Sequence, residues 1–145
     1  MKNNPAIEWT ILPSWPVSVH ICDIEGIHHP LTPEQVRQFY ETTIKNLEVV
    51  VWTDKVENLL GFKAGISEHV WKINEIEKVT FRFARPAKGA GFFWLSVNKA
   101  DNTEEAIAGG DSYSDSILFW FRSVIDTMKS MAHVRVEEVD IGYDA

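Results

Sequence analysis

The chain has 145 residues, of which 45% are hydrophobic and 24% are charged, and its formal net charge is −7 at pH 7. This length and composition indicate one globular domain with an ordinary hydrophobic core, and they exclude a disordered chain. The negative charge repels nucleic acid and anionic membrane surfaces, which argues against a nucleic-acid-binding or membrane-binding protein.

Two short strands are predicted near the N-terminus, after residues 1–5, which we expect to fray. Residues 7–12 and 17–22 each alternate apolar and polar side chains with a period of two, which is typical of strands. Pro13 and Pro16 separate the two segments, because proline cannot continue the hydrogen-bonded ladder of a sheet.

The first predicted helix spans residues 33–46. Thr32 is suited to the N-cap and Pro33 to the first helical turn, and apolar residues follow at helical spacing. Residues 48–53 form a β-branched run that predicts a buried strand.

Residues 54–77 show no dominant period, and we expect a strand or turn near 57–63 and a helical turn near 67–73. Residues 78–84 and 92–97 alternate clearly and predict a strand pair. The glycine-containing connection between them is too long for a two-residue hairpin turn, so it should project from the sheet.

Residues 98–112 are mostly polar and contain an Ala-Ile-Ala patch that predicts an edge strand. Residues 114–131 predict a core helix, because one apolar stripe recurs with a period of 3.6 residues. Residues 133–141 predict a final strand with a bulge near Glu137 and Glu138. A helix as apolar as 114–131 must be covered by a sheet or by other helices.

The order of these elements predicts an α+β fold in one domain spanning residues 1–145. We expect one largely antiparallel sheet, with two main helices, 33–46 and 114–131, packed on one face.

The cellular location is predicted from what the sequence lacks. Cys22 is the only cysteine, so no disulfide can form within the chain. The first residues contain no apolar run typical of a signal peptide, and no segment approaches 18 uninterrupted apolar residues. We therefore expect a cytoplasmic protein.

Five groups able to bind a metal or act in catalysis occur within ten residues: His20, Cys22, Asp23, His28 and His29. Their spacing is not a regular zinc-site spacing. A nucleophilic cysteine with a histidine base would also need a third, orienting group, and none is identified. We therefore expect a buried structural cysteine, no metal and no cofactor, and we keep these residues as an alternative ligand pocket.

A basic segment with neighbouring aromatics is the second candidate: Lys78, Arg82, Arg85, Lys88, Phe92, Phe93 and Trp94. Such a pattern can bind single-stranded nucleic acid, and the amides of Gly89 and Gly91 could approach a phosphate. The sheet must bury half of these aromatics, and the net charge opposes a polyanion, so nucleic acid is disfavoured.

Acidic and aromatic residues form the third candidate, a partner-binding surface: Trp15, Glu104, Glu105, Asp111, Tyr113, Glu137, Glu138, Asp140 and Tyr143. An acidic rim around exposed aromatics suits a basic protein partner.

No motif of a catalytic triad, a nucleotide-binding loop or a zinc site is present, so the sequence favours a binding protein over an enzyme. The expected function is that of a small acidic binding protein, in concrete form an inhibitor or immunity-type protein that neutralises a basic toxin or nuclease. The alternative is a small-molecule-binding protein or enzyme with an aromatic-lined pocket between the sheet and the helices.

Overall fold

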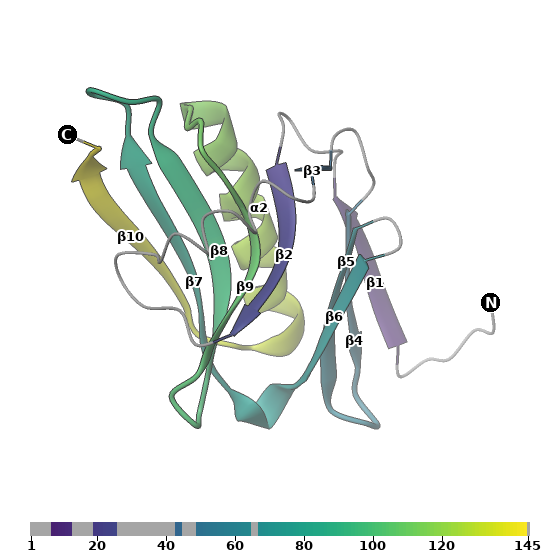
Figure 1. Cartoon of the computed structure of the whole chain (residues 1–145). Helices are drawn as coiled ribbons and strands as arrows, with labels where there is room; N and C mark the ends of the chain where they lie inside the picture. Colours follow the sequence, from purple (N-terminus) through teal and green to yellow (C-terminus); the bar gives the residue numbers. More distant parts are fainter. Residues whose placement is uncertain (1–6, 13–18, 26–42, 45–48, 65–66, 145) are drawn as a thin grey trace.

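The computed structural model describes residues 7–12, 19–25, 43–44, 49–64 and 67–144 (Figure 1). Strands dominate this part of the chain, and one α-helix, α2, occurs in it. The elements are β1 (Ile7–Leu12), β2 (Val19–Glu25), β3 (Thr43–Ile44), β4 (Val49–Asp54), β5 (Leu59–Ala64), β6 (Ser67–Lys72), the 3-10 turn η1 (Ile73–Glu75), β7 (Ile76–Arg85), β8 (Phe92–Lys99), β9 (Glu104–Gly110), α2 (Asp115–Ala132) and β10 (Val136–Tyr143).

The strands form two sheets. Sheet A has four antiparallel strands in the order β1-β4-β5-β6, and sheet B has six strands in the order β10-β7-β8-β9-β2-β3. The turn η1 carries the chain from β6, at one edge of sheet A, to β7 in the interior of sheet B (Figure 1). In sheet B, β10 pairs with β7 in parallel, while the other neighbouring strands are antiparallel.

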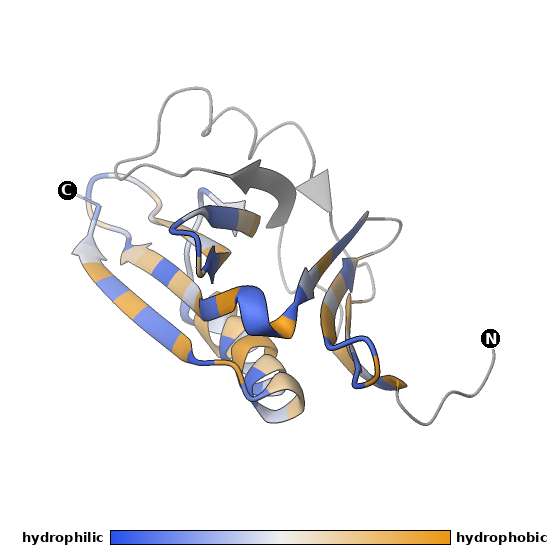
Figure 2. Ribbon diagram, turned by 90° about the horizontal axis from the view of Figure 1, so that it is seen from below, coloured by the Kyte–Doolittle hydropathy of each residue, from blue (hydrophilic) through white to orange (hydrophobic). Residues whose placement is uncertain are grey.

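Helix α2 packs against both sheets, with contacts to β1 and β4 of sheet A and to β7 and β10 of sheet B. Its buried stripe contains Ile117, Leu118, Trp120, Phe121, Val124, Ile125, Met128 and Ala132. These residues belong to the same hydrophobic cluster as Phe62 of sheet A and Phe81 of sheet B. The amphipathic pattern of 114–131 therefore identified the interior helix correctly, and Figure 2 shows the helix between the strands of sheet B and those of sheet A.

The predicted architecture of one mostly antiparallel sheet with two helices on one face is wrong, because the described strands divide into two sheets around one helix. Residues 43–44 of the predicted helix 33–46 lie in β3, and the rest of that helix falls outside the described residues. Alternation along a strand shows which side chains share a face, but it does not specify the neighbouring strand.

Three further local predictions differ from the structure. The helical turn expected near residues 67–73 is strand β6 up to Lys72, and its side chains alternate between exposed and buried from Glu68 onward. The edge strand expected in 98–112 is β9, which lies between β8 and β2 inside sheet B. The register shift of the last strand falls between Asp140 and Gly142, not at Glu137 and Glu138.

Candidate functional site

The acidic residues predicted near the C-terminus are paired with basic residues of the same chain. The pairs are Glu137 with Lys78 (3.0 Å), Glu138 with Arg122 (2.8 and 2.9 Å) and Asp140 with Arg85 (2.5 Å). The hydrogen bond from Arg85 is the main reason why the pKa of Asp140 lies below its ordinary value. These pairs neutralise both the predicted acidic cluster and part of the predicted basic segment.

Asp144 holds the loop that joins β7 and β8. Its carboxylate accepts hydrogen bonds from the backbone N–H groups of Gly91 (2.7 Å), Ala87 (2.7 Å) and Gly89 (3.3 Å). These bonds, that from Gly91 above all, lower the pKa of Asp144. The amides that the sequence offered to a phosphate are therefore bound to the chain's own carboxylate.

Glu104, predicted at a partner-binding surface, is buried instead. Its carboxylate accepts hydrogen bonds from Arg82 Nη1 (2.5 Å), Ser96 Oγ (2.5 Å) and Asn98 Nδ2 (3.0 Å). This network joins β7, β8 and β9 side by side, so Glu104 stabilises sheet B from within.

Glu105 points the other way and connects the two sheets. Its carboxylate in β9 lies 2.5 Å from His69 Nδ1 and 3.2 Å from Trp71 Nε1, both on β6 of sheet A. Lys99 Nζ lies 3.3 Å away on β8. Burial, the strongest single influence, raises the pKa of Glu105, but the hydrogen bonds from His69, Trp71 and Lys99 together outweigh it and lower the pKa.

A pocket of about 560 Å³ adjoins this connection between the sheets. The rings of His69 and Trp71 lie nearly parallel in its wall, with centroids 5.8 Å apart. The lining residues are Leu59, Glu68, His69, Val70, Trp71, Lys72, Glu75, Ile76, Lys99 and Glu105. None of the sequence predictions included this site, although strand alternation in residues 67–72 would have placed His69 and Trp71 on one face.

The remaining predicted residues are dispersed. Tyr113 is buried against Phe83, with ring centroids 5.2 Å apart, whereas Asp111 and Tyr143 are exposed. Trp15, His28 and His29 fall outside the described residues, and the proposed pocket residues His20, Cys22 and Asp23 lie in β2, whose side chains are not described.

The side chains described contain no group of three or more His, Cys, Asp or Glu residues arranged to hold a metal ion. Among the described helices, none is both long enough and apolar enough to span a membrane.

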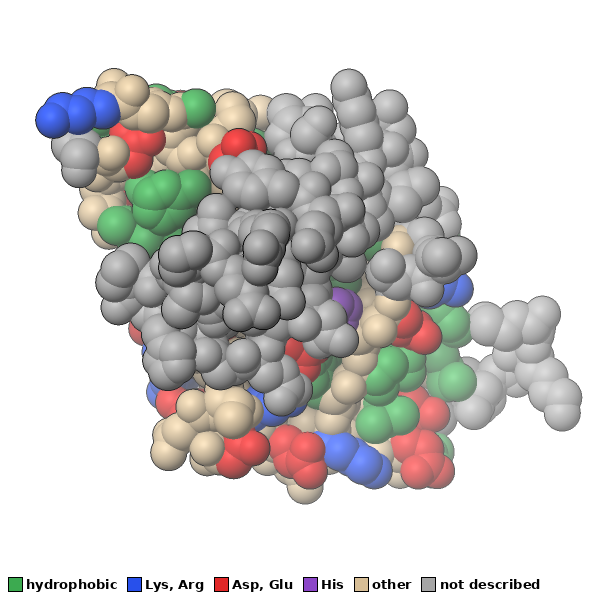
Figure 3. All heavy atoms as spheres, in the orientation of Figure 1, with side chains coloured by type: hydrophobic (Ala, Val, Ile, Leu, Met, Phe, Trp, Pro, Cys, Tyr) green, Lys and Arg blue, Asp and Glu red, His purple; other side chains and the backbone are tan. Residues whose placement is uncertain are grey.

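The outer face of sheet A, which we call the apolar face, carries large side chains exposed to water. Trp9, Ile11 and Val70 are 43%, 64% and 44% exposed. The strand register aligns Trp9 of β1, Trp52 of β4, Gly61 of β5 and Val70 of β6 in one row across the sheet. Hydrophobic side chains surrounded by charged ones are visible on this side of the molecule, on the right of Figure 3.

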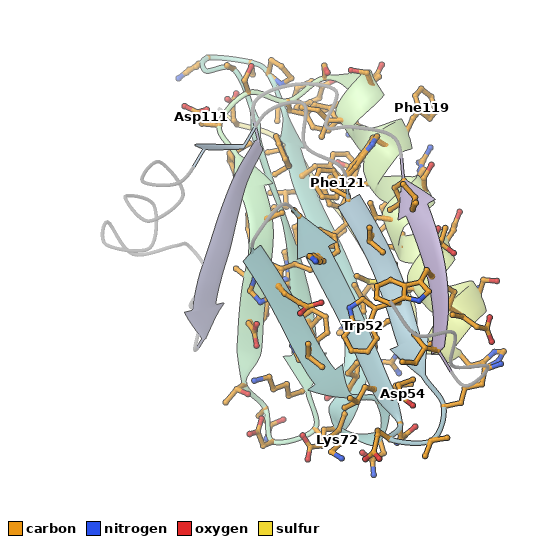
Figure 4. The ribbon with its side chains drawn as sticks, turned by 90° about the vertical axis from the view of Figure 1, so that its right-hand side faces the viewer. Trp52, Asp54, Lys72, Asp111, Phe119 and Phe121 are labelled. Atoms are coloured by element: carbon orange, nitrogen blue, oxygen red, sulfur yellow. The ribbon has the colours of Figure 1, made fainter. Side chains whose placement is uncertain are left out.

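Gly61 shapes the centre of the apolar face. A Cβ atom at this position would overlap the indole of Trp52, so the indole lies directly over the glycine backbone. Trp52 Nε1 donates a hydrogen bond to Glu68 Oε2 (2.8 Å), and the Trp9 ring lies 6.1 Å from that of Trp52. Figure 4 shows Trp52 lying across the strands of sheet A. The Trp52 indole is therefore held over Gly61 by its hydrogen bond to Glu68, beside the tilted ring of Trp9.

The family model of the PM0294 C-terminal domain matches residues 32–139, about three quarters of the chain. The chain belongs to the PM0294 C-terminal domain family. The matched range of this family includes the His69–Glu105 connection and β4 to β6 of the apolar face, while β1 and β2 precede it. No curated protein and no solved structure matches the chain.

Proposed function

We propose that this chain is a cytoplasmic protein-binding domain and that the apolar face contacts its partner. The observation that carries the proposal is the exposure of Trp9, Ile11 and Val70 on one face of sheet A beside Trp52. Contiguous exposed apolar side chains typically mark interaction sites, and tryptophan is enriched among the residues that dominate binding energy.

The partner's charge follows from the net charge of −7, which favours a basic protein. An inhibitor or immunity-type protein that neutralises a basic toxin or nuclease is the concrete form of this proposal. Because Glu137, Glu138 and Asp140 are paired within the chain, we expect the apolar contact to supply most of the affinity. The overall charge then acts mainly on the association rate.

Replacing Val70 with aspartate is expected to weaken partner binding about tenfold or more, because a charge would be buried unpaired at the interface. Val56, which is 76% exposed in the β4–β5 turn, provides the matched control Val56→Asp. The measurement is affinity capture from a lysate of the source cells, followed by surface plasmon resonance with the captured protein.

Two results would contradict this proposal: capture of no protein at low or high salt, or equal binding by wild type and Val70→Asp. Added salt is expected to slow association with a basic partner and to leave dissociation nearly unchanged. An association rate that does not change with salt concentration would contradict only the proposal that the partner is basic.

A small-molecule-binding function is a second candidate, favoured by the pocket beside the stacked His69 and Trp71 rings. Lys72 in its lining suits a small planar acid, whereas Lys99 is already paired with Glu105. A ligand of this class, at about one hundred times its dissociation constant, is expected to stabilise the fold by about 2.7 kcal/mol. Thermal-shift screening measures the increase in melting temperature that the ligand causes, and this increase should vanish in Trp71→Leu. An increase of the same size in that variant would show that the ligand binds elsewhere.

A further inference from the structure

The open edges of the two sheets differ in how they are protected against pairing with another strand. Sheet B ends at β10, where Glu137, Glu138 and Asp140 and a register shift interrupt the edge. Charges and bulges of this kind commonly prevent edge-to-edge association. Sheet A ends at β6, which faces the pocket, and at β1, which carries a single charged residue, Glu8.

Strand β1 combines an open edge with exposed apolar side chains. Among the described strands it pairs with β4 alone, so its other edge presents backbone N–H and C=O groups without a strand partner. Trp9 and Ile11 are exposed on its outer face, while Thr10 on the opposite face contacts Met131 of α2 (3.2 Å). In Figure 4, β1 lies at the border of sheet A, next to α2.

The sequence of β1 is complementary to itself. An antiparallel pairing of two β1 strands about a two-fold axis at Trp9 places Ile7 opposite Ile11 of the second copy and Trp9 opposite Trp9 of the second copy. All of these side chains lie on the outer face, because residues 7, 9 and 11 share it. Glu8 then faces Thr10 of the second copy, so the opposite face of the pairing is polar; within each copy Glu8 forms an ion pair with Lys55 and Thr10 contacts Met131. Aromatic and β-branched residues are favourable in such cross-strand positions.

We propose that two copies of this chain associate through β1 in antiparallel orientation, with the two-fold axis at Trp9. This pairing joins the two four-stranded sheets into one sheet of eight strands and satisfies the backbone groups of both edges. Ile7 of each copy contacts Ile11 of the other, so the same surface is used by both copies, as a closed two-fold dimer requires. The apolar faces of both copies become one continuous surface.

A cross-linking experiment tests the register, in a Cys22→Ser background of the full chain. The double variant Ile7→Cys, Ile11→Cys should form disulfide-linked dimers, because opposed residues of an antiparallel pair have Cα atoms about 4.5–5.5 Å apart. Within one copy the two positions are about 13 Å apart along the strand, so no internal disulfide competes.

Each single variant is the matched control. Ile7→Cys alone or Ile11→Cys alone should remain unlinked, since identical positions lie about 13 Å apart in this register, while a mixture of the two single variants should cross-link. Failure of the double variant and of the mixture, or equal linking by a single variant, overturns the proposed pairing.

The mass in solution provides the second measurement. Wild type at micromolar concentration should show twice the chain mass of 16.6 kDa by light scattering, and Ile11→Lys should return it to 16.6 kDa. The control Val56→Lys, which alters an exposed turn residue, should stay dimeric. A monomeric wild type, or a dimer that Ile11→Lys leaves intact, contradicts the proposal. Val70→Asp, on β6, should leave this dimer unchanged, so failure here is separable from failure of partner binding.

Discussion

Replacing Phe121 with alanine is expected to lower the free energy of unfolding by about 3–5 kcal/mol, the usual cost of removing a large aromatic from a core. Phe121 is fully buried on α2, and its ring stacks on Phe81 of sheet B at 4.6 Å and lies 5.5 Å from Phe93. Little can move to fill the cavity, because sheet strands and the helix fix its walls. Chemical denaturation followed by circular dichroism measures the loss.

Phe119→Ala is the control for this prediction, since Phe119 lies two residues earlier on the same helix and is 62% exposed. Its ring contacts only the guanidinium of Arg122 among the ring and cation contacts described, with 5.8 Å between centroid and Cζ. We expect a loss below about 1 kcal/mol. Equal losses in the two variants would show that α2 does not bury the face assigned to it.

Replacing Glu105 with glutamine is expected to cost about 3 kcal/mol and to lower Tm by about 10 °C, because it breaks a buried ionic connection. The carboxylate joins β9 of sheet B to His69 and Trp71 of sheet A. Without its charge, Lys99 also loses its buried partner. The measurement is thermal and urea unfolding at pH 7, and Glu57→Gln in the exposed β4–β5 turn removes the same charge without this connection.

The same carboxylate predicts a pH dependence with a definite sign. The pKa of Glu105 is lower in the folded chain than its ordinary value of 4.5. The folded state therefore binds the proton less readily than the unfolded state, and Glu105 contributes stability above pH 4.5 that is lost as the pH falls through its folded pKa. The stability difference between wild type and Glu105→Gln should accordingly shrink on acidification. A difference that is constant from pH 7 to pH 3 would contradict the assignment.

Local patterns in the sequence were sufficient for several elements. The alternation of residues 7–12 gave the bounds of β1, and the 3.6-residue period of 114–131 identified α2 and its buried face. These predictions were correct because the periodicity of a strand or a helix is apparent from the order of polar and apolar residues within one segment.

The candidate surfaces could not be obtained in this way. The ion pairs of Asp140 and Glu137 could not be predicted from the sequence, because their partners Arg85 and Lys78 are 55 and 59 residues away. Glu104 and Glu105 were both assigned to the partner-binding surface. They lie on opposite faces of β9, so Glu104 bonds to Ser96 within sheet B and Glu105 bonds to His69 of sheet A.

The sequence by itself determined the interior helix and the strands whose side chains alternate clearly, such as β1, β7 and β8, but not β6, where a helical turn was expected. Only the tertiary structure decided that the strands divide into two sheets, that Glu105 connects them, and that Trp9, Ile11 and Val70 remain exposed. The physical reason is that the energy of a sheet depends on pairings between distant strands. Trp52 illustrates it, because its position over Gly61 and beside Trp9 arises only when β1, β4 and β5 lie in register.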